Sequence, residues 1–572
     1  MLKNEVAMKL HLLADLLEVQ SENPFQARAY RNAARALESM TGALEDAVSA
    51  GTLIKVPGIG KSIAKDITEL AGTGTSARLT VLEAAVPPGL RDLLRVPGLG
   101  STRARALCRD LGIDGIASLK AACEDGRVAE LKGFGEKTTR RILEGIAYIA
   151  SVAGRFRIDQ ILPSALDIED HMRRSPAIER VEVCGSLRRR RETIKDIDIV
   201  ASSSRPELVM EHFIHAPRVA AVVARGPTKT SVRLSNGIGA DLRVVTGAQF
   251  PAALQYFTGS SEHNTILRGI ARDLGLKLNE YGLFRGEEPL PLEDEGSIYA
   301  ALGLDLVPPE LREGLGEIGP PRPGGRPRLV ERGDLQGMLH VHTTWSDGTA
   351  SIEDMARGAR ERGYTYIGIT DHSQSAAYAR GLSVERVLQQ HEEIDRLNAR
   401  GSGIRIWKGI ESDIRPDGSL DYEPDVLDRF DFVIASVHSS FKLPEDVMTD
   451  RVLRALADPH TTFLGHPTGR LLLARDAYAI HMDRVLAAAA AMGVAVELNA
   501  DPHRLDLDWR HGARARELGV MTSIHPDAHS VGGMDNVDYG IGIARKGGFS
   551  REQVVNALDV RAFEDFVRRR KR

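Results

Sequence analysis

Cysteine is scarce in this chain, and long hydrophobic runs are missing. The 572 residues include three cysteines, Cys108, Cys123 and Cys184. A scattered and odd set does not suit a disulfide framework, so we expect reduced thiols in a cytoplasmic protein. No apolar run reaches the roughly 18–20 residues that span a bilayer. The opening MLKNEVAMKLHLLADLLEV has the spacing of an amphipathic helix and not of a signal peptide. We therefore expect no membrane partner.

An excess of basic residues is missing as well. The formal net charge is −4 at pH 7, with 42% hydrophobic and 27% charged residues, which is ordinary for a globular protein. This balance excludes a uniformly basic nucleic-acid binder, so any contact with DNA must be local or made by backbone groups. The length predicts roughly three to four domains.

A hydrophobic-Gly-hydrophobic-Gly turn precedes a helical pattern three times, in VPGIGKSIAKDI (56–67), VPGLGSTRARAL (96–107) and LKGFGEKTTRRI (131–142). Two glycines permit unusual backbone angles and expose amides at a helix N-terminus. A DNA phosphate can bind to these amides whatever the base sequence. Alternatively, the glycines could have no function other than to cap the helix pairs. Three copies, each followed by a basic residue, favour helix-hairpin-helix motifs that bind the DNA backbone. The residues expected at DNA are Gly58, Gly60, Lys61, Gly98, Gly100, Arg103, Gly133, Gly135 and Lys137.

Two aspartates alternate along a strand-like run in GSLRRRRETIKDIDIV (185–200). On a strand, Asp196 and Asp198 point to the same face, where their charges repel unless a cation lies between them. Mg²⁺ commonly takes one or two carboxylates and phosphate oxygens. Asp241, in GADLRVV, is a third candidate on a neighbouring strand. A solvated strand face would explain the pair on its own, but the third aspartate favours a metal site.

The turn before these aspartates suits a polyphosphate. Gly185 and Ser186 supply a tight turn with amides and a hydroxyl, and residues 188–191 supply four arginines.

The C-terminal part is rich in histidine. GEIGPPRPGGRPRLVERGD (316–334) reads as an extended linker. Strand-like and helical segments then alternate, which predicts a barrel-type α/β domain with its site at the C-terminal strand ends. Ligands without cysteine suit Zn²⁺, Mn²⁺ or Fe²⁺, and two or three such ions can activate water against a phosphodiester. We assign no role to His525. The candidate ligands near strand ends are His340, His342, Asp347, His372, Glu411, His438, His466, Asp527 and His529.

These motifs resemble known families. Residues 1–311 resemble a family X DNA polymerase of the polymerase beta group, through the Gly-Ser, Asp-x-Asp and Asp set and, more specifically, YFTGSSEHN (256–264). Residues from about 333 to 572 resemble the PHP (polymerase and histidinol phosphatase) domain, and all nine ligand positions match. The order of the two is that of the bacterial and archaeal PolX group.

The resemblance implies a multidomain fold: an all-α helix-hairpin-helix region, an α+β nucleotidyltransferase palm and thumb, and an α/β PHP barrel of distorted TIM type. We expect the domains at 1–85 and 86–155 (helix-hairpin-helix), 156–248 (palm), 249–315 (thumb), 316–334 (linker) and 335–572 (PHP).

It also implies site residues. Asp196, Asp198 and Asp241 would be the catalytic metal carboxylates of the palm. The residues implied at the nucleotide are Gly185, Ser186 and Arg189 at the triphosphate, Tyr256, Phe257 and Gly259 at the sugar, Asn264 at the base, and Arg268 toward the template.

The implied activities are gap-filling DNA synthesis in repair and 3′-5′ exonuclease activity, with AP-endonuclease or 3′-end processing as a possible extension. The implied cofactors are Mg²⁺ or Mn²⁺ at the palm and two to three Zn²⁺, Mn²⁺ or Fe²⁺ ions in the PHP domain. Gapped or primed DNA and dNTPs are the implied partners of a monomer. Two alternatives remain: a DNA-tethered phosphatase of small phosphate monoesters, and a non-catalytic DNA-end scaffold. The YFTGSSEHN segment counts against the first, and the intact ligand positions count against the second.

One position departs from the family. Members that remove a deoxyribose phosphate carry a Schiff-base lysine on the helix of the first hairpin. Alignment on VPGIG places Asp66 there, so we expect weak or absent lyase activity. Tyr30 matches a family phosphate-binding position, and recognition of a 5′-phosphate is still expected from it.

Overall fold

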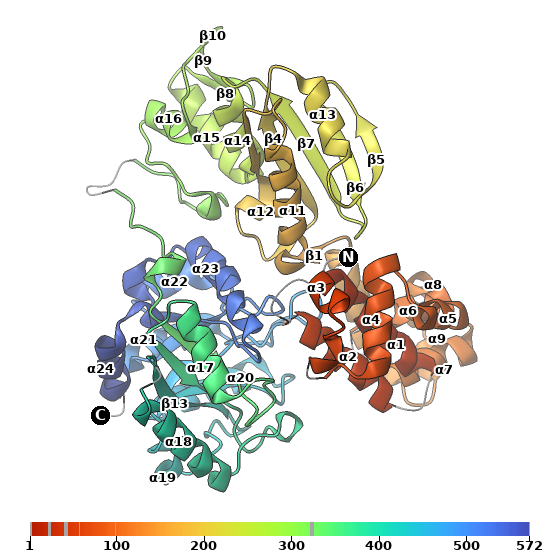
Figure 1. The fold of residues 1–572 in the computed structure, drawn as a ribbon, viewed down its shortest axis with the longest axis vertical. Coiled ribbons are helices and arrows are strands. Elements are labelled where there is room, and N and C mark those ends of the chain that lie inside the picture. Colours follow the sequence, from red (N-terminus) through yellow and green to blue (C-terminus); the bar gives the residue numbers. More distant parts are fainter. Residues whose placement is uncertain are drawn as a thin grey trace. The chain divides into compact units, whose positions relative to one another are not determined.

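The computed structural model describes residues 3–20, 24–38, 40, 44–56, 58–97, 99–320, 325–401 and 403–570. They form two compact units (Figure 1): Met1–Ala153 with Leu473–Arg475 and His529–Gly533, and Gly154–Leu472 with Asp476–Ala528 and Met534–Arg572. Among the described residues, none of the helices has both the length and the apolar character that a membrane crossing requires.

The described residues before Gly154 are helical and contain no strand. Buried aliphatic side chains from these helices form one core, and α3–α4, α6–α7 and α9–α10 are the three hairpins. The helices are α1 (Lys3–Gln20), α2 (Pro24–Glu38), α3 (Leu44–Ser49), η1 (Leu53–Lys55), α4 (Lys61–Thr73), α5 (Ala77–Ala85), α6 (Pro88–Leu94), α7 (Ser101–Leu111), α8 (Ile116–Glu124), α9 (Arg127–Glu130) and α10 (Gly135–Val152).

A five-stranded sheet in the order β2-β4-β7-β6-β5 follows, with β4 and β7 parallel and the other pairs antiparallel. Ile197 and Ile199 of β4 are buried, so Asp196 and Asp198, which alternate with them, lie on the opposite face. The elements are β1 (Phe156–Arg157), α11 (Ile158–Arg173), β2 (Arg180–Val183), α12 (Gly185–Arg188), β3 (Thr193–Ile194), β4 (Asp196–Ser202), α13 (Pro206–Ile214), β5 (Val219–Arg225), β6 (Lys229–Leu234) and β7 (Gly239–Val245).

The next region combines helices with a small antiparallel sheet, β10-β9-β8, which the sequence did not indicate. Its core includes Leu267, Leu283, Ile298 and Tyr299. The elements are α14 (Phe250–Thr258), α15 (Ser261–Asp273), β8 (Lys277–Asn279), β9 (Gly282–Arg285), β10 (Glu288–Pro289), α16 (Glu295–Ala301) and η2 (Pro309–Leu311).

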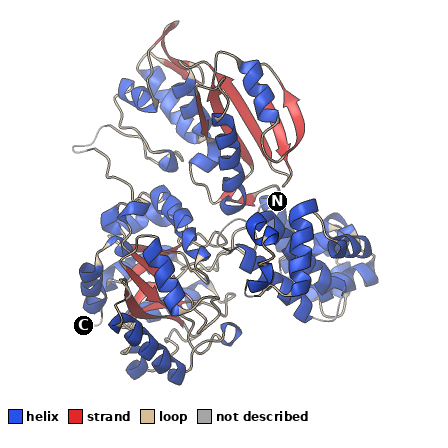
Figure 2. Ribbon diagram, in the orientation of Figure 1, coloured by secondary structure: helices blue, strands red, loops and turns tan. Residues whose placement is uncertain are grey.

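The C-terminal region is a barrel of seven parallel strands whose spatial order follows the sequence. In Figure 2 helices surround much of this strand layer, which explains why most of the strands are buried on both faces. The strands are β11 (Gly337–Val341), β12 (Tyr366–Ile369), β13 (Arg405–Asp413), β14 (Phe432–Ser436), β15 (Thr461–Leu464), β16 (Ala495–Asn499) and β17 (Thr522–His525).

The barrel helices include long ones between the strands and a C-terminal one, whose Phe563 packs against Tyr366 and Trp407. The helices are η3 (Arg332–Asp334), α17 (Ile352–Glu361), η4 (Ala377–Ala379), α18 (Val384–Ala399), α19 (Pro424–Leu427), α20 (Glu445–Ala457), α21 (Met482–Met492), η5 (Trp509–His511), α22 (Gly512–Glu517), η6 (Gly532–Asn536), α23 (Val537–Lys546), η7 (Arg551–Gln553), η8 (Val555–Ala557) and α24 (Val560–Arg570).

The first and last strands of the barrel are joined by a short bridge. Val341 pairs with Ala528 in a parallel bridge, and the backbone N–H of His342 donates to the Ala528 carbonyl at 2.9 Å. The segment after β17 thereby lies beside the end of β11. The linker also contacts this domain, because Leu329 bridges to Ser550.

Candidate functional site

Three aspartates meet on β4 and β7. Asp198 pairs in register with Asp241, and Asp196 lies two residues before Asp198 on the same face. Lys229 Nζ lies 2.5 Å from Asp241 Oδ2. Burial, with the charges of Asp196 and Asp241, raises the pKa of Asp198 to about 7. An oxygen-only donor set with this excess of negative charge fits a divalent cation.

The turn before β4 brings the backbone against these carboxylates. Gly185 has φ +63°, and a Cβ at this position would lie 2.1 Å from Asp198 Oδ2. Glycine is therefore required both by the backbone angle and by the close approach. Ser186 follows on α12 and lines the adjoining cavity.

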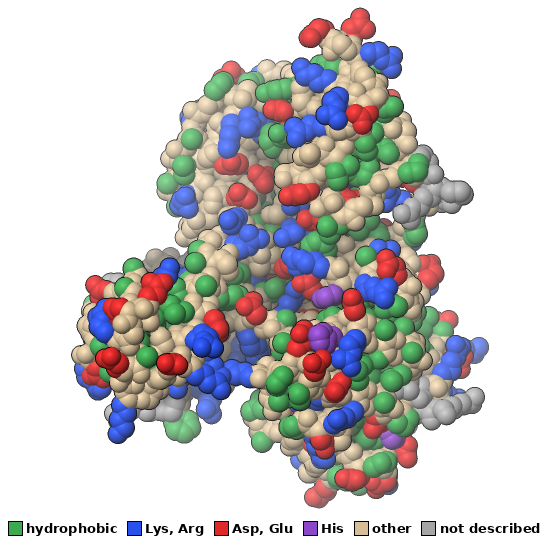
Figure 3. Space-filling model, turned by 180° about the vertical axis from the view of Figure 1, so that it is seen from behind, with side chains coloured by type: hydrophobic (Ala, Val, Ile, Leu, Met, Phe, Trp, Pro, Cys, Tyr) green, Lys and Arg blue, Asp and Glu red, His purple; other side chains and the backbone are tan. Residues whose placement is uncertain are grey.

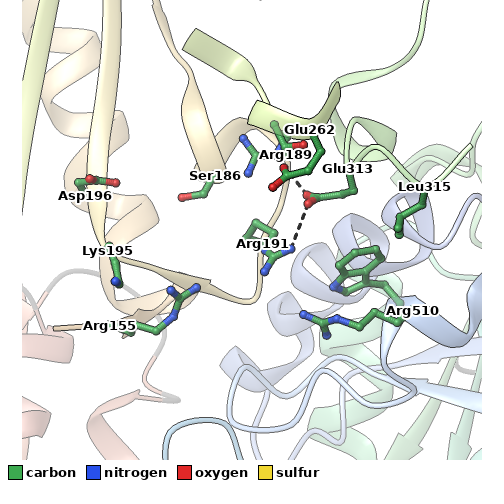
Figure 4. A pocket seen from close by; sticks show the side chains of 12 residues that line it. Arg155, Ser186, Arg189, Arg191, Lys195, Asp196, Glu262, Glu313, Leu315 and Arg510 are labelled. Carbon is green, nitrogen blue, oxygen red and sulfur yellow. Dashed lines mark hydrogen bonds and ion pairs between the residues drawn. The ribbon is translucent and has the colours of Figure 1, made fainter. Parts of the chain in front are cut away.

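A cavity of about 550 Å³ opens beside this turn (Figure 4). Two of the arginines that line it donate hydrogen bonds to the Glu313 carboxylate. Glu313 Oε1 accepts from Arg189 Nε at 3.1 Å, and Oε2 accepts from Arg191 Nη1 at 3.0 Å. Lys546 Nζ on α23 also contacts Glu313 Oε1. The cavity is lined by Arg155, Ser186, Arg189, Arg191, Lys195, Asp196, Ser260, Glu262, Glu313, Leu315, Trp509 and Arg510.

The YFTGSSEHN segment lies at the junction of α14 and α15. Tyr256 and Phe257 contact edge to face, and Gly259, with φ +71°, lies beside Arg189. Asn264 is buried: its side chain accepts from Gln255 Nε2 and donates to the Tyr256 carbonyl, both at 2.8 Å. The amide expected at the base is thus held inside the protein. Arg268 Nε donates to the Asn264 carbonyl at 3.4 Å.

The histidine and acidic residues predicted as ligands converge at the C-terminal end of the barrel. Glu411, almost fully buried, lies at the centre: its Oε1 is 2.9 Å from His466 Nε2, 3.2 Å from His438 Nε2 and 3.3 Å from His340 Nε2. Asp527 Oδ1 lies 3.2 Å from His342 Nε2. Groups whose ligand atoms lie within 4.8 Å of one another are His342, Asp347, His372 and His529; His340, His342 and Asp527; and His372, Glu411 and His438.

The backbone is strained at three of these residues. His340, His466 and Asp527 have φ of +60°, +21° and +52°, a backbone conformation that residues other than glycine rarely adopt. At β11 the pairing with β12 shifts register between Met338 and Val341, and His340 lies within this irregularity. Such strain persists where the surrounding structure holds it, often at functional positions.

The electrostatics of this centre fit metal cations. Burial alone would raise the pKa of Glu411, but His438 and His340 outweigh burial and hold it well below its usual range. Burial alone would lower the pKa of His340, but Glu497, Asp527 and Glu411 raise it well above its usual range. His340 Nε2 has no hydrogen-bond partner in the described structure, although carboxylates lie close by. Mixed nitrogen and oxygen donors suit Zn²⁺, Mn²⁺ or Fe²⁺. A space-filling view shows histidine among acidic and basic side chains on one face (Figure 3).

Three buried residues behind the histidines were not assigned any function from the sequence. Glu497 contacts His340 Nδ1 and accepts from His525 Nδ1 at 3.0 Å. His525, to which the sequence assigned no role, is thus linked to the cluster through Glu497. Asp413 Oδ1 lies 2.5 Å from His438 Nδ1. A charged residue inside an otherwise buried strand was the available signal for Glu497.

The described hairpin glycines lie at exposed helix starts. Gly60 and Gly100 are the N-caps of α4 and α7, and Gly58, Gly133 and Gly135 have positive φ. The basic residues Lys61, Arg103 and Lys137 are exposed in the first turn of α4, α7 and α10. Gly98 lies outside the described residues.

Tyr30 does not present its hydroxyl to solvent. It is 2% exposed, and its O–H donates to the buried Asp66 carboxylate. Arg78 Nε lies 3.5 Å from Asp66 Oδ2 and its guanidinium lies over the Tyr30 ring. A phosphate at Tyr30 would face this carboxylate, which does not favour the expected 5′-phosphate contact.

Four family models match the chain. The helix-hairpin-helix domain matches residues 1–76, and the SAM-like helix-hairpin-helix tandem matches 90–147. The DNA polymerase beta thumb matches residues 253–313, and the PHP domain matches 338–501. The predicted fold class is confirmed by these matches and by the seven-stranded barrel.

The similarity to one relative extends over nearly the whole chain. A DNA polymerase/3′-5′ exonuclease PolX of Bacillus subtilis (strain 168) is 41% identical over 571 residues, which is 99% of each chain. Probable phosphatases of Thermoanaerobacter sp. (strain X514) and Edwardsiella ictaluri (strain 93-146) are 27% and 30% identical, and each match covers 41% of this chain and 94% of the relative. The chain belongs to the PolX family of DNA polymerases that carry a PHP domain. This membership implies DNA binding and divalent metal cations.

Proposed function

We propose that this chain is a DNA-directed DNA polymerase for gap filling in repair and a 3′-5′ exonuclease, with the two activities at separate centres. One observation carries the proposal: a carboxylate set on β4 and β7 and a histidine-rich set at the barrel end occur in the same chain. The PolX name of the Bacillus subtilis relative supports both activities.

At the palm, Asp196, Asp198 and Asp241 would hold the cations, and the turn at Gly185 and Ser186 would bind the triphosphate through its amides and hydroxyl. Arg189 would add a charged donor to the same phosphates. The side chains of Tyr256 and Phe257 would position the nucleotide sugar. When bound, divalent cations at either centre lower the pKa of the attacking hydroxyl or water and offset charge on the phosphate.

At the barrel end, the imidazole and carboxylate groups around Glu411 would hold two or three cations. The same imidazole and carboxylate groups would orient a water toward the last phosphodiester of a 3′ end. We propose Mg²⁺ or Mn²⁺ for the palm and Zn²⁺, Mn²⁺ or Fe²⁺ for the barrel, with dNTPs and gapped DNA as substrates of a monomer. AP-endonuclease or 3′-end processing would use the same attack.

A second candidate function is hydrolysis of small phosphate monoesters. The probable phosphatases that match the barrel favour it, although they match 41% of this chain. A monoesterase would leave the aligned aspartates of β4 and β7 unexplained.

The test is a primed one-nucleotide gap assayed with Mg²⁺ or Mn²⁺, with and without dNTPs. We expect Asp198→Ala to reduce extension to background and to keep 3′-end degradation. We expect His342→Ala to do the reverse. Degradation that survives His342→Ala would overturn the assignment of the nuclease to the barrel, and loss of both activities in each variant would show that the centres are not independent.

A further inference from the structure

A carboxylate with no assigned function lies behind the histidine cluster. Glu497, on β16, is fully buried. Its Oε1 accepts from His340 Nδ1 and from His525 Nδ1, the latter at 3.0 Å. Its Oε2 accepts from the backbone N–H of His466 and, at 3.3 Å, from Asn499 Nδ2. Both oxygens are therefore engaged, and two of the four donors belong to candidate metal ligands.

These contacts determine which nitrogen of His340 can bind a cation. A nitrogen that binds a cation carries no hydrogen, so the ring is neutral in the metal-bound state. A carboxylate oxygen only accepts, so the remaining hydrogen of the His340 ring must then lie on Nδ1. The lone pair is then on Nε2, the atom that lies 3.3 Å from Glu411 Oε1 and 3.6 Å from Asp527 Oδ1. Without this acceptor, the hydrogen could move to Nε2 and the ligand atom would face away from the centre.

The same carboxylate supports strained backbone. His466 has φ +21°, and its N–H is one of the donors to Glu497 Oε2. His340 has φ +60°. Glu497 thus accepts from the strained backbone of His466 and holds His340, a second residue with strained backbone, through its side chain. His525 completes the arrangement, because its Nε2 contacts Ser523 Oγ at 2.7 Å.

A cation bound directly by Glu497 is the competing explanation, since His340, Glu497 and His525 also bring three ligand atoms within 4.8 Å of one another. Such a cation would displace the hydrogens that His340 and His525 share with Oε1. It would also require His340 to use Nδ1 in place of the Nε2 atom that faces Glu411.

We propose that Glu497, with His525 behind it, is a positioning residue that holds His340 and His466 in the geometry that binds metal in the barrel. The proposal rests on the proposed function of that centre. Asp413 stands in the same relation to His438, at 2.5 Å from its Nδ1, so carboxylates on β13 and β16 orient ligands from behind the site. Partners of this kind typically set metal affinity by about 10–100-fold.

The experiment measures Mn²⁺ binding to the full-length protein without DNA, by metal analysis and calorimetric titration after chelation. We expect Glu497→Gln to weaken Mn²⁺ binding by about 10–100-fold and to leave the number of bound ions at saturation unchanged. Exonuclease activity should return as Mn²⁺ is raised, and primer extension should not change. His525→Ala should weaken binding in the same direction and by less.

The matched control is Asp334→Asn, a buried carboxylate in η3, just before β11, that has no contact with the cluster in the described structure. Wild-type affinity in Glu497→Gln, one ion fewer at saturation, or an equal loss in Asp334→Asn would each overturn the proposal. Because metal binding is read without DNA, a wild type that binds Mn²⁺ but degrades no 3′ ends would count against the proposed function and not against this proposal.

Discussion

At the residue scale, the backbone of Gly185 lies directly against the Asp198 carboxylate. A Cβ there would meet the Asp198 carboxylate at 2.1 Å, and φ is +63°. We expect Gly185→Ala to displace Asp198 and to reduce primer extension at least about 100-fold, while the exonuclease activity is unchanged. Extension rates on a primed gap, together with exonuclease rates on the same DNA, measure this effect.

Gly237 provides the control for backbone strain alone. Its φ is +88° but nothing lies within 4 Å of a Cβ. Both alanine variants should lose about 1–2 kcal/mol of stability, and only Gly185→Ala should lose extension. Equal extension in the two variants would show that the close approach to Asp198 is unimportant.

The spacing of residues in the sequence was enough to predict some of the candidate site residues and not others. Asp196 and Asp198 alternate on an apolar strand, and histidines recur at strand ends, so both sets could be found by spacing alone. Glu497 could not, because its partners come from β11, from β17 and from the segment after β15, and no local pattern points to these partners. The Asn264 side chain is likewise held by contacts that spacing does not reveal.

At the scale of elements, Glu192 joins the segment before β3 to η5. It accepts from Trp509 Nε1 at 3.0 Å and from Arg510 Nη1 at 2.9 Å. Burial alone would raise the pKa of Glu192, but Arg510 and Arg470 outweigh burial and lower the pKa to about 2. A carboxyl with a lowered pKa binds fewer protons in the folded chain. Its stabilisation is therefore complete above about pH 4.5 and is lost as the pH falls toward about 2.

We expect the thermal midpoint of Glu192→Gln to lie below that of the wild type at pH 6, and the difference to shrink steadily as the pH is lowered to 3. Glu517→Gln on α22, whose side chain is 67% exposed, should show almost no difference at either pH. Melting curves at matched ionic strength provide the measurement. A gap between wild type and Glu192→Gln that is as wide at pH 3 as at pH 6 would refute the linkage.

Some elements followed from the sequence and others did not. The barrel followed, because its buried parallel strands read as continuous apolar runs between helical segments. The sheet β8-β9-β10 did not, because Lys277–Asn279 and Glu288–Pro289 are too short and polar to show an alternating pattern. The linker residues before η3 read as extended, but the bridge of Leu329 to Ser550 depends on a distant partner.

At the scale of the whole molecule, Glu313 connects the cavity beside Ser186 with the barrel. Its carboxylate contacts Arg189 and Arg191 on one side and Lys546 of α23 on the other. A triphosphate that binds the same arginines must displace it. We expect Glu313→Gln to lower the KM for dNTP by about tenfold or more, since a hydrogen bond to a charged group contributes about 1.5–3 kcal/mol. Steady-state extension of a gap measures the KM.

Glu310→Gln is the control that separates competition between Glu313 and the triphosphate from a general destabilisation of the contacts of α23. In the described structure, Glu310 Oε1 accepts from Arg545 Nε on α23 at 2.7 Å, and its side chain makes no hydrogen bond or ion pair with Arg189 or Arg191. It should leave the KM for dNTP unchanged. An unchanged or higher KM in Glu313→Gln, or an equal fall in both variants, would argue against competition at the cavity.

The sequential order of the barrel strands has a consequence for biosynthesis. The palm strands are complete at Val245, whereas the bridge that joins β11 to the last part of the barrel forms at Ala528. On the ribosome, the carboxylate centre can therefore assemble long before its histidine-rich counterpart has all of its donors. A nascent chain would acquire the means to extend a primer before the means to shorten one.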